Sequence, residues 1–243
     1  MKQAHAFIKY LDSSFLSEAK ELLAQPNGRH CSWDNCYGTF KQLREQMSEQ
    51  NTQVQNLDDD TIDKLALHLG FYLASWGMYR GSSCLLQLDH TVHEPIVRIV
   101  LKRKYNEIAG MKYEHFLNHP EKLNLIMEAA SEIRESYDNS FHLLQPEKPT
   151  KASDTLVTKV LLGTLACCPA YDRNVKLTLR KGLPSKICQT FKKESLENLL
   201  DVFREADISR LSEGAESLYS PPSDMRLIDL TLWLYAYKHG KEL

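Results

Sequence analysis

The feature that most constrains the fold is one long apolar stretch, residues 61–79, which reads TIDKLALHLGFYLASWGMY. Leu and Ala favour a helix, and the aspartates at 58–60 before the stretch supply N-cap residues. Drawn as a helix, the stretch carries apolar side chains on nearly every face, and such a helix has to be enclosed by other elements. We therefore predict that residues 61–79 form a buried helix at the centre of a packed helical protein.

Helical spacing of apolar residues recurs along the whole chain of 243 residues. Further helices are predicted over residues 16–24, 39–50, 92–105, 122–137, 155–168, 173–182, 196–206, 210–218 and 225–237. Residues 30–38 read instead as a polar and aromatic loop, and no segment alternates as a strand does. The sequence therefore predicts an all-α fold, in a chain long enough to bury a substantial core.

The charge balance limits the partners that this chain attracts. Thirty Lys and Arg residues face 32 Asp and Glu residues, which gives a net charge of −2. Nucleic acid would therefore require a local basic face, because the whole chain is not basic. No apolar run reaches the ~18 residues that span a bilayer, and the amino end lacks the apolar stretch of a signal peptide. We expect a cytoplasmic monomer with no membrane contact.

Metal and cofactor sites are not predicted. Six cysteines are scattered through helical patterns, which favours reduced thiols over disulfides. Cys31 and Cys36 have metal-like spacing beside His30, but no second Cys or His pair stands nearby to complete a tetrahedral zinc site. The pairs His90/His93 and His115/His119 lack the glutamate of the HExxH metalloprotease pattern.

One segment, residues 154–182, carries a chemical indication. An apolar helix is predicted to begin after Ser153 and to end before Pro169, and Asp172 then stands at the start of a basic helix. Backbone N–H groups and the positive end of the helix dipole favour a charged carboxylate there. Such a group either only caps the helix, or stabilises a developing cation and acts as a base toward water.

This segment resembles the catalytic stretch of the helix-hairpin-helix DNA glycosylases. In that family an apolar helix, a connection with Pro and small residues, and an Asp at the start of the next helix follow one another, with Val and Arg further on. Residues 155–168, Pro169-Ala170-Tyr171, Asp172, Val175 and Arg180 are similar to that order. The resemblance implies two helical lobes with a cleft between them, a central lobe over about 57–168 and a second lobe made of 1–56 and 169–243.

The sequence also departs from the family pattern. The family's hairpin has a Gly-x-Gly turn that grips a DNA phosphate, whereas residues 149–153 here read PTKAS, without glycine. The lysine nucleophile of bifunctional members is missing at its usual spacing, since Lys151 and Lys159 only flank that position. The family's cysteine quartet for an iron–sulfur cluster is also missing. The resemblance therefore implies a monofunctional enzyme without a cofactor, in which a flipped base is released by hydrolysis and Asp172 stabilises the sugar cation.

Other residues are assigned by type and position. For the base pocket, we expect polar and aromatic residues of the 30–38 loop and the neighbour of Asp172, namely Trp33, Asp34, Asn35, Tyr37 and Tyr171. For contacts to DNA, we expect cations and short polar groups, namely Arg80, Ser82, Ser83, Lys151, Ser153, Lys159, Arg173, Asn174 and Lys176. Double-stranded DNA with a damaged, alkylated or bulky modified base is the expected partner, in repair or in defence against phage.

Two other functions stay open at this point. The chain fits a non-enzymatic helical module that binds nucleic acid or protein, such as a toxin–antitoxin or phage-defence component. It also fits a different hydrolase or ribonuclease whose site is the Trp33 loop. Trp33 and its neighbours equally suit a loop held by one buried aromatic side chain, and Arg80 to Ser83 equally suit an ordinary helix end.

Overall fold

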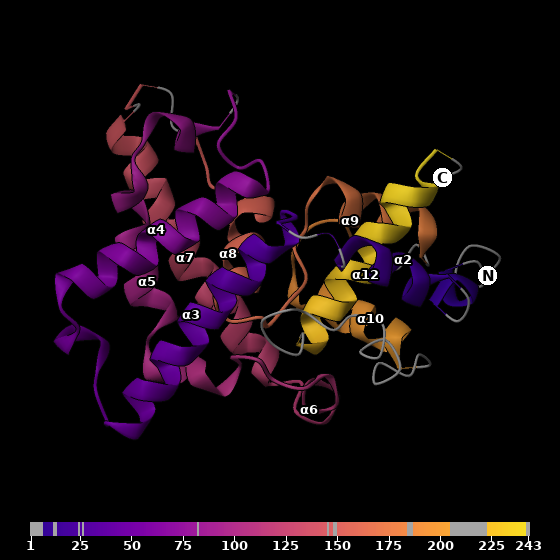
Figure 1. Cartoon of the computed structure of the whole chain (residues 1–243), viewed down its shortest axis with the longest axis horizontal. Coiled ribbons are helices and arrows are strands. Elements are labelled where there is room, and N and C mark those ends of the chain that lie inside the picture. Colours follow the sequence, from indigo (N-terminus) through magenta and orange to yellow (C-terminus); the bar gives the residue numbers. More distant parts are fainter. Residues whose placement is uncertain are drawn as a thin grey trace.

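The structure, a computed structural model, describes residues 7–11, 14–23, 25, 27–81, 83–144, 146–147, 150–183, 187–204 and 223–241. These residues are helical or irregular and contain no strand, so the all-α prediction is confirmed (Figure 1). The α-helices are α2 (Phe15–Leu23), α3 (His30–Glu49), α4 (Asp59–Ser75), α5 (Glu94–Val100), α6 (Tyr113–Asn118), α7 (Lys122–Leu144), α8 (Asp154–Thr164), α9 (Arg173–Leu177), α10 (Lys193–Phe203) and α12 (Asp224–His239). The helix predicted over 210–218 lies outside the described residues.

The helices form two groups that lie side by side (Figure 1). Helices α3, α4, α5, α7 and α8 pack on one another, while α12 packs on α2 and α9. Residues 30–49 were expected in the second lobe, but α3 packs on α4 and α8 and so belongs to the first group. This corrects the predicted boundary, because long-range packing and not chain order decides which group a helix joins.

The helix at the centre of the first group is α8 and not α4. Every residue of α8 from Leu156 to Thr164 is buried, and α3, α4 and α7 all pack on it. Helix α4 instead has an outer face, on which Leu67 is 48% and Phe71 is 65% exposed. The apolar character of residues 61–79 therefore predicted the helix but not its position, since apolar residues also occur on protein surfaces.

The loop predicted over residues 30–38 is wrong, because these residues form the first turns of α3. The indole N–H of Trp33 donates to the carbonyl of Leu162 over 3.0 Å, and the Trp33 ring stacks on Tyr37 with 5.0 Å between centroids. The hydrogen bond joins α3 to α8 across a long sequence separation, while the stacking lies within α3. Such tertiary contacts override the weak helix propensity of the Ser, Asp and Asn residues in this segment.

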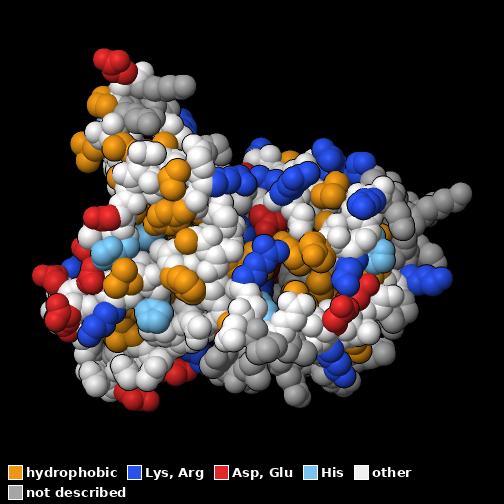
Figure 2. Space-filling model, turned by 45° about the horizontal axis from the view of Figure 1, so that its top comes forward, with side chains coloured by type: hydrophobic (Ala, Val, Ile, Leu, Met, Phe, Trp, Pro, Cys, Tyr) orange, Lys and Arg blue, Asp and Glu red, His pale blue; other side chains and the backbone are white. Residues whose placement is uncertain are grey.

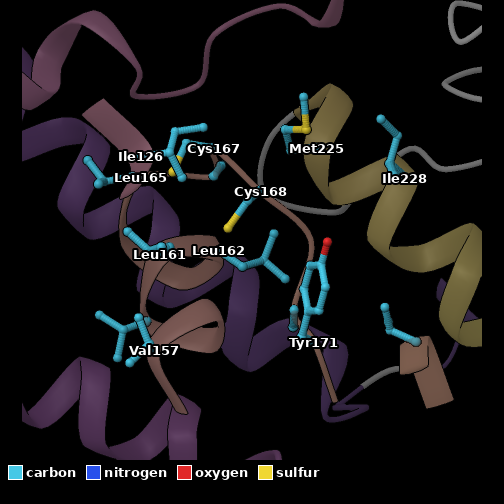
Figure 3. Close-up of a cluster of buried hydrophobic side chains, with 14 of the residues drawn as sticks. Ile126, Val157, Leu161, Leu162, Leu165, Cys167, Cys168, Tyr171, Met225 and Ile228 are labelled. Atoms are coloured by element: carbon cyan, nitrogen blue, oxygen red, sulfur yellow. The ribbon is translucent and has the colours of Figure 1, made fainter. Parts of the chain in front are cut away.

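A buried apolar cluster joins the two groups of helices. Helix α8 ends at Thr164, earlier than predicted, and Ala166 has a positive φ of 48°. The chain then crosses toward α12, so side chains of α8 and of the crossing segment meet side chains of α12 (Figure 3). The residues that Figure 3 labels are Ile126, Val157, Leu161, Leu162, Leu165, Cys167, Cys168, Tyr171, Met225 and Ile228. The crossing segment leads directly to Asp172, so this core positions the candidate site.

Among the described residues, no helix is both long and apolar enough to cross a bilayer.

Candidate functional site

Asp172 is the N-cap residue of α9, as the sequence predicted. One carboxylate oxygen, Oδ1, accepts hydrogen bonds from the backbone N–H groups of Asn174 and Val175 at 3.0 and 3.1 Å. The residue before the helix has extended backbone angles, which is the usual N-cap geometry. The side chain is 15% exposed, so it is neither sealed in the core nor fully in solvent.

The other carboxylate oxygen of Asp172 faces a buried lysine. The ammonium of Lys159 lies 3.1 Å from Oδ2, and the Lys159 side chain is only 4% exposed. Lys159 was predicted to contact DNA, whereas the structure places its ammonium against Asp172. Because a buried ammonium is unfavourable without a partner, this ion pair ties the position of Asp172 to α8.

Three hydrogen bonds fix the backbone just before Asp172. The Ala170 N–H donates to Asp229 over 2.9 Å, and the Tyr171 N–H donates to the Thr158 hydroxyl over 2.8 Å. The Thr155 hydroxyl donates to the Tyr171 carbonyl, also over 2.8 Å. Both the approach to Asp172 and its side chain are therefore held by α8 and α12, which is the rigidity that a preorganised catalytic group needs.

A second buried ion pair lies beside the first. The guanidinium of Arg226 is 2.8 Å from the carboxylate of Asp229, and both residues of α12 are buried. Burial raises the pKa of Asp229, and the positive charge of Arg226 opposes that rise. The negative charge of the nearby Asp172 also raises the pKa of Asp229.

The ring of Trp76 lies close to the cations of both ion pairs, Lys159 and Arg226. Its ring centroid is 4.7 Å from the Arg29 guanidinium carbon, 5.0 Å from the Lys159 ammonium and 5.6 Å from the Arg226 guanidinium carbon. The ring of Trp233 meets it edge-on at 5.9 Å. We call these five residues the Trp76 cluster. The sequence indicated only a core role for Trp76, because no local pattern links positions 29, 76, 159, 226 and 233.

A pocket of about 410 Å³ adjoins the Trp76 cluster. Arg29 and Trp233 belong to both, and the pocket continues over Trp233 to Tyr237, whose ring stacks on Trp233 at 4.8 Å. The remainder is lined by polar side chains such as Glu18, Glu21 and His30 and by two leucines, Leu22 and Leu234. The pocket thus combines aromatic faces with hydrogen-bonding groups, as ligand pockets commonly do.

Lys and Arg side chains surround a hollow in one face of the molecule. Figure 2 shows this hollow in the middle of one face, with Lys and Arg side chains around it and acidic and hydrophobic side chains inside it. In the part of the chain that the structure describes, Arg80, Lys151, Arg173, Lys176 and Arg180 form no ion pair, whereas cations such as Lys104 and Arg98 do. Unpaired cations remain available for anions such as phosphate groups.

Three other residues that were predicted to contact DNA lie at the starts of three different helices. Ser153 caps α8, since its hydroxyl accepts a hydrogen bond from the Leu156 N–H over 3.2 Å. Ser83 caps the short helix η2 (Cys84–Gln87) in the same manner. Asn174 follows Asp172 in the first turn of α9. Ser82 lies outside the described residues.

The residues predicted for a base pocket do not come together around one. Trp33, Tyr37 and Tyr171 are buried in the core, and so is Asp34. Asn35 alone of this set is exposed. Because the Trp33 segment is a helix packed on α8, its rings face the interior and offer no free face to a ligand, which corrects the predicted pocket.

Among the described residues, no three His, Cys, Asp or Glu side chains are arranged so that they could hold a metal ion. No protein-family model matches the sequence, and neither a curated protein nor a solved structure shows significant similarity to the chain.

Proposed function

We propose that the protein is a monofunctional DNA glycosylase, which hydrolyses the N-glycosidic bond of a damaged or modified base. The observation that carries the proposal is the partly exposed carboxylate of Asp172, which is held at a helix start by two backbone N–H groups and by Lys159. It lies beside a cluster of aromatic rings and cations, close to helix α9 with its unpaired cations. A carboxylate held in this position is suited to stabilise the sugar cation that forms when the glycosidic bond breaks.

In the proposed reaction, the target nucleotide rotates out of the duplex, and the bond between base and sugar breaks with both bonding electrons leaving on the base. The sugar then carries positive charge, which the Asp172 carboxylate stabilises while it orients the attacking water. The water oxygen bonds to the sugar carbon, and the proton that the water loses passes by way of Asp172 to the departed base. Lys159 and the two N–H groups keep the carboxylate in place during these steps. Arg80, Lys151, Arg173, Lys176 and Arg180 would neutralise the phosphates of the duplex.

The arrangement of helices is compatible with the two-lobed form of the glycosylases. Residues 150–153 lie directly before α8, where the resemblance to the glycosylases would put the hairpin of that family. Although they contain no glycine, they are tied to α7, because the Ala152 N–H donates to Asp138 and Arg134 donates to the Ala152 carbonyl. A rigid turn can therefore form here without the glycines. We assign phosphate binding at this turn to Lys151, which is exposed.

The test is a base-release assay on duplexes that each contain one alkylated, oxidised, deaminated or bulky modified base. Free base and alkali-labile strand breaks are measured for the wild-type protein and for Asp172→Asn. Asparagine still caps a helix, and its amide oxygen can still accept a hydrogen bond from Lys159, so the fold should persist while base release falls by about three orders of magnitude. The matched control is Asp58→Asn, which changes the N-cap of α4 in the same way, far along the chain from Asp172.

Failure to release any base from any of these duplexes would contradict the proposal. DNA binding without base release would instead favour a helical nucleic-acid-binding module. Binding has its own test, since Arg173→Gln should lower the slope of log affinity against log salt by about one if Arg173 contacts a phosphate. Lys41→Gln, in which the exchanged cation is paired with Glu45 on the same helix, should leave that slope unchanged.

A further inference from the structure

Arg29 stands out in the Trp76 cluster because it is the exposed member. Its guanidinium carbon lies 4.7 Å from the Trp76 ring and 5.0 Å from the Trp233 ring. Across the residues that the structure describes, Arg29 forms no ion pair and no side-chain hydrogen bond, so contacts with two indole rings account for its position. An exposed cation held in this way is bound weakly, because exposed cation–π contacts contribute only about 0.5–1 kcal/mol each.

The two indole rings form a corner that accepts a flat group. Trp76 and Trp233 are perpendicular, with an interplanar angle of 90°, so a planar group between them stacks on one ring and meets the edge of the other. Guanidinium is planar, and so is a nucleobase, which gains about 1–3 kcal/mol by stacking on an aromatic side chain. A nucleobase is thus expected to replace the weakly held guanidinium.

A second observation indicates that the corner is incomplete without a ligand. The indole N–H of Trp76 is shielded from solvent and has no hydrogen-bond partner among the described residues. Such a donor is unfavourable unless an acceptor satisfies it. The ring nitrogens and carbonyl oxygens of nucleobases are acceptors. The adjoining pocket of about 410 Å³ gives room for the remainder of a nucleotide or for a substituent on its base.

We propose that Arg29 covers a nucleotide-binding corner formed by Trp76 and Trp233. When a nucleotide enters, its base takes the place of the guanidinium against the two rings, and Arg29 moves to the phosphate of the same nucleotide. Charge is then better balanced than before, because the cation leaves Lys159 and Arg226 and meets an anion. This inference rests on the proposed function in one respect only, namely that the nucleotide belongs to a DNA strand. The corner itself does not depend on Asp172.

The experiment compares two probes, deoxyadenosine and deoxyadenosine 5′-monophosphate, by quenching of tryptophan fluorescence in the full chain. The wild-type protein should bind the nucleotide more tightly than the nucleoside, because only the nucleotide has a phosphate that the displaced Arg29 can bind. In Arg29→Ala the corner is already open, so the nucleoside should bind about fivefold more tightly, while the preference for the nucleotide should disappear. These opposite changes would not arise from a merely structural role of Arg29.

A control variant keeps the result specific. Arg103→Ala removes another exposed arginine, whose guanidinium donates to the side chain of Asn51, and both affinities should stay at wild-type values. The two proposals fail separately. If the wild-type protein binds the nucleotide but releases no base from DNA, the glycosylase proposal fails and the nucleotide-binding corner stands.

The inference is overturned if neither probe quenches the wild-type fluorescence in a saturable way. It is also overturned if Arg29→Ala weakens both probes by the same factor, since Arg29 would then not cover the rings. Equal effects of Arg103→Ala and Arg29→Ala would likewise overturn it, because general charge would then explain the binding.

Discussion

Two buried polar clusters adjoin α4, and they differ in charge and in access to solvent. In the first, Asp172 pairs with Lys159 and Asp229 pairs with Arg226. In the second, which we call the His93 cluster, the His93 imidazole lies between two hydroxyl groups. Tyr79 is 2.6 Å from its Nε2 atom and Tyr137 is 2.8 Å from its Nδ1 atom. The first cluster holds four charges, whereas the second holds none.

The difference separates a structural role from a chemical one. His93 is fully buried, and burial together with the nearby His90 lowers its pKa to about 3, so it stays neutral with both nitrogens satisfied. Such a cluster only joins the segment after α4 and the short helix η3 (His90–His93) to α7. The first cluster keeps one carboxylate partly exposed and pairs it with a buried ammonium, an arrangement that is costly for stability and fits the catalytic role proposed for Asp172.

The largest effect is expected when the ion pair of the first cluster is broken. Asp172→Ala removes an N-cap and leaves the Lys159 ammonium buried without a partner, which should lower the free energy of unfolding by about 4 kcal/mol. Adding Lys159→Met removes the buried charge, so the double variant should regain more than half of that loss. Urea unfolding measures both values. A double variant no more stable than Asp172→Ala would contradict the pairing.

A smaller loss of stability is expected in the His93 cluster. Tyr137→Phe leaves the Nδ1 atom of His93 without a partner and should lower the free energy of unfolding by about 2 kcal/mol, with base release unchanged. The matched control is Tyr105→Phe, because the Tyr105 hydroxyl is buried and has no hydrogen-bond partner among the described residues. That control should lose nothing. Loss of base release in Tyr137→Phe would erase the distinction between the two clusters.

A gradual effect, comparable over two pH units with that of Tyr137→Phe, is a dependence of stability on pH. The unfolded chain binds a proton at His93 near the ordinary pKa of 6.5, whereas the folded protein binds it only near 3. The contribution of His93 is therefore present above pH 6.5, and it falls by about 1.4 kcal/mol per pH unit as the pH drops below that value. Between pH 7 and pH 5, His93→Gln should unfold with a flatter pH profile than wild type. The exposed His68 provides the control, and His68→Gln should keep the wild-type slope. Equal slopes in His93→Gln and wild type would show that His93 does not titrate as a buried neutral group.

Local patterns in the sequence predicted most of the helices and some of their starts, but they missed α6 and the first turns of α3. Ser153 and Asp172 both cap the helices they were expected to cap, because an N-cap bond joins residues only two or three positions apart. The all-α class also followed, since the spacing of apolar residues is a property of each helix by itself. The catalytic role of Asp172 is still a prediction that awaits the base-release assay.

Tertiary structure alone decided which residues surround Asp172. The sequence indicated that Lys159 is a cation that contacts DNA, but Lys159 is the buried partner of Asp172. It also indicated that Trp33 belongs to a loop, but Trp33 is a core residue of α3. Arg29, Trp76 and Trp233 meet only because α3, α4 and α12 converge. The sequence by itself determined the helical elements and their caps, through contacts between near neighbours. The burial of α8 and the assembly of the Trp76 cluster depend on contacts between residues far apart in the chain, which no local pattern encodes.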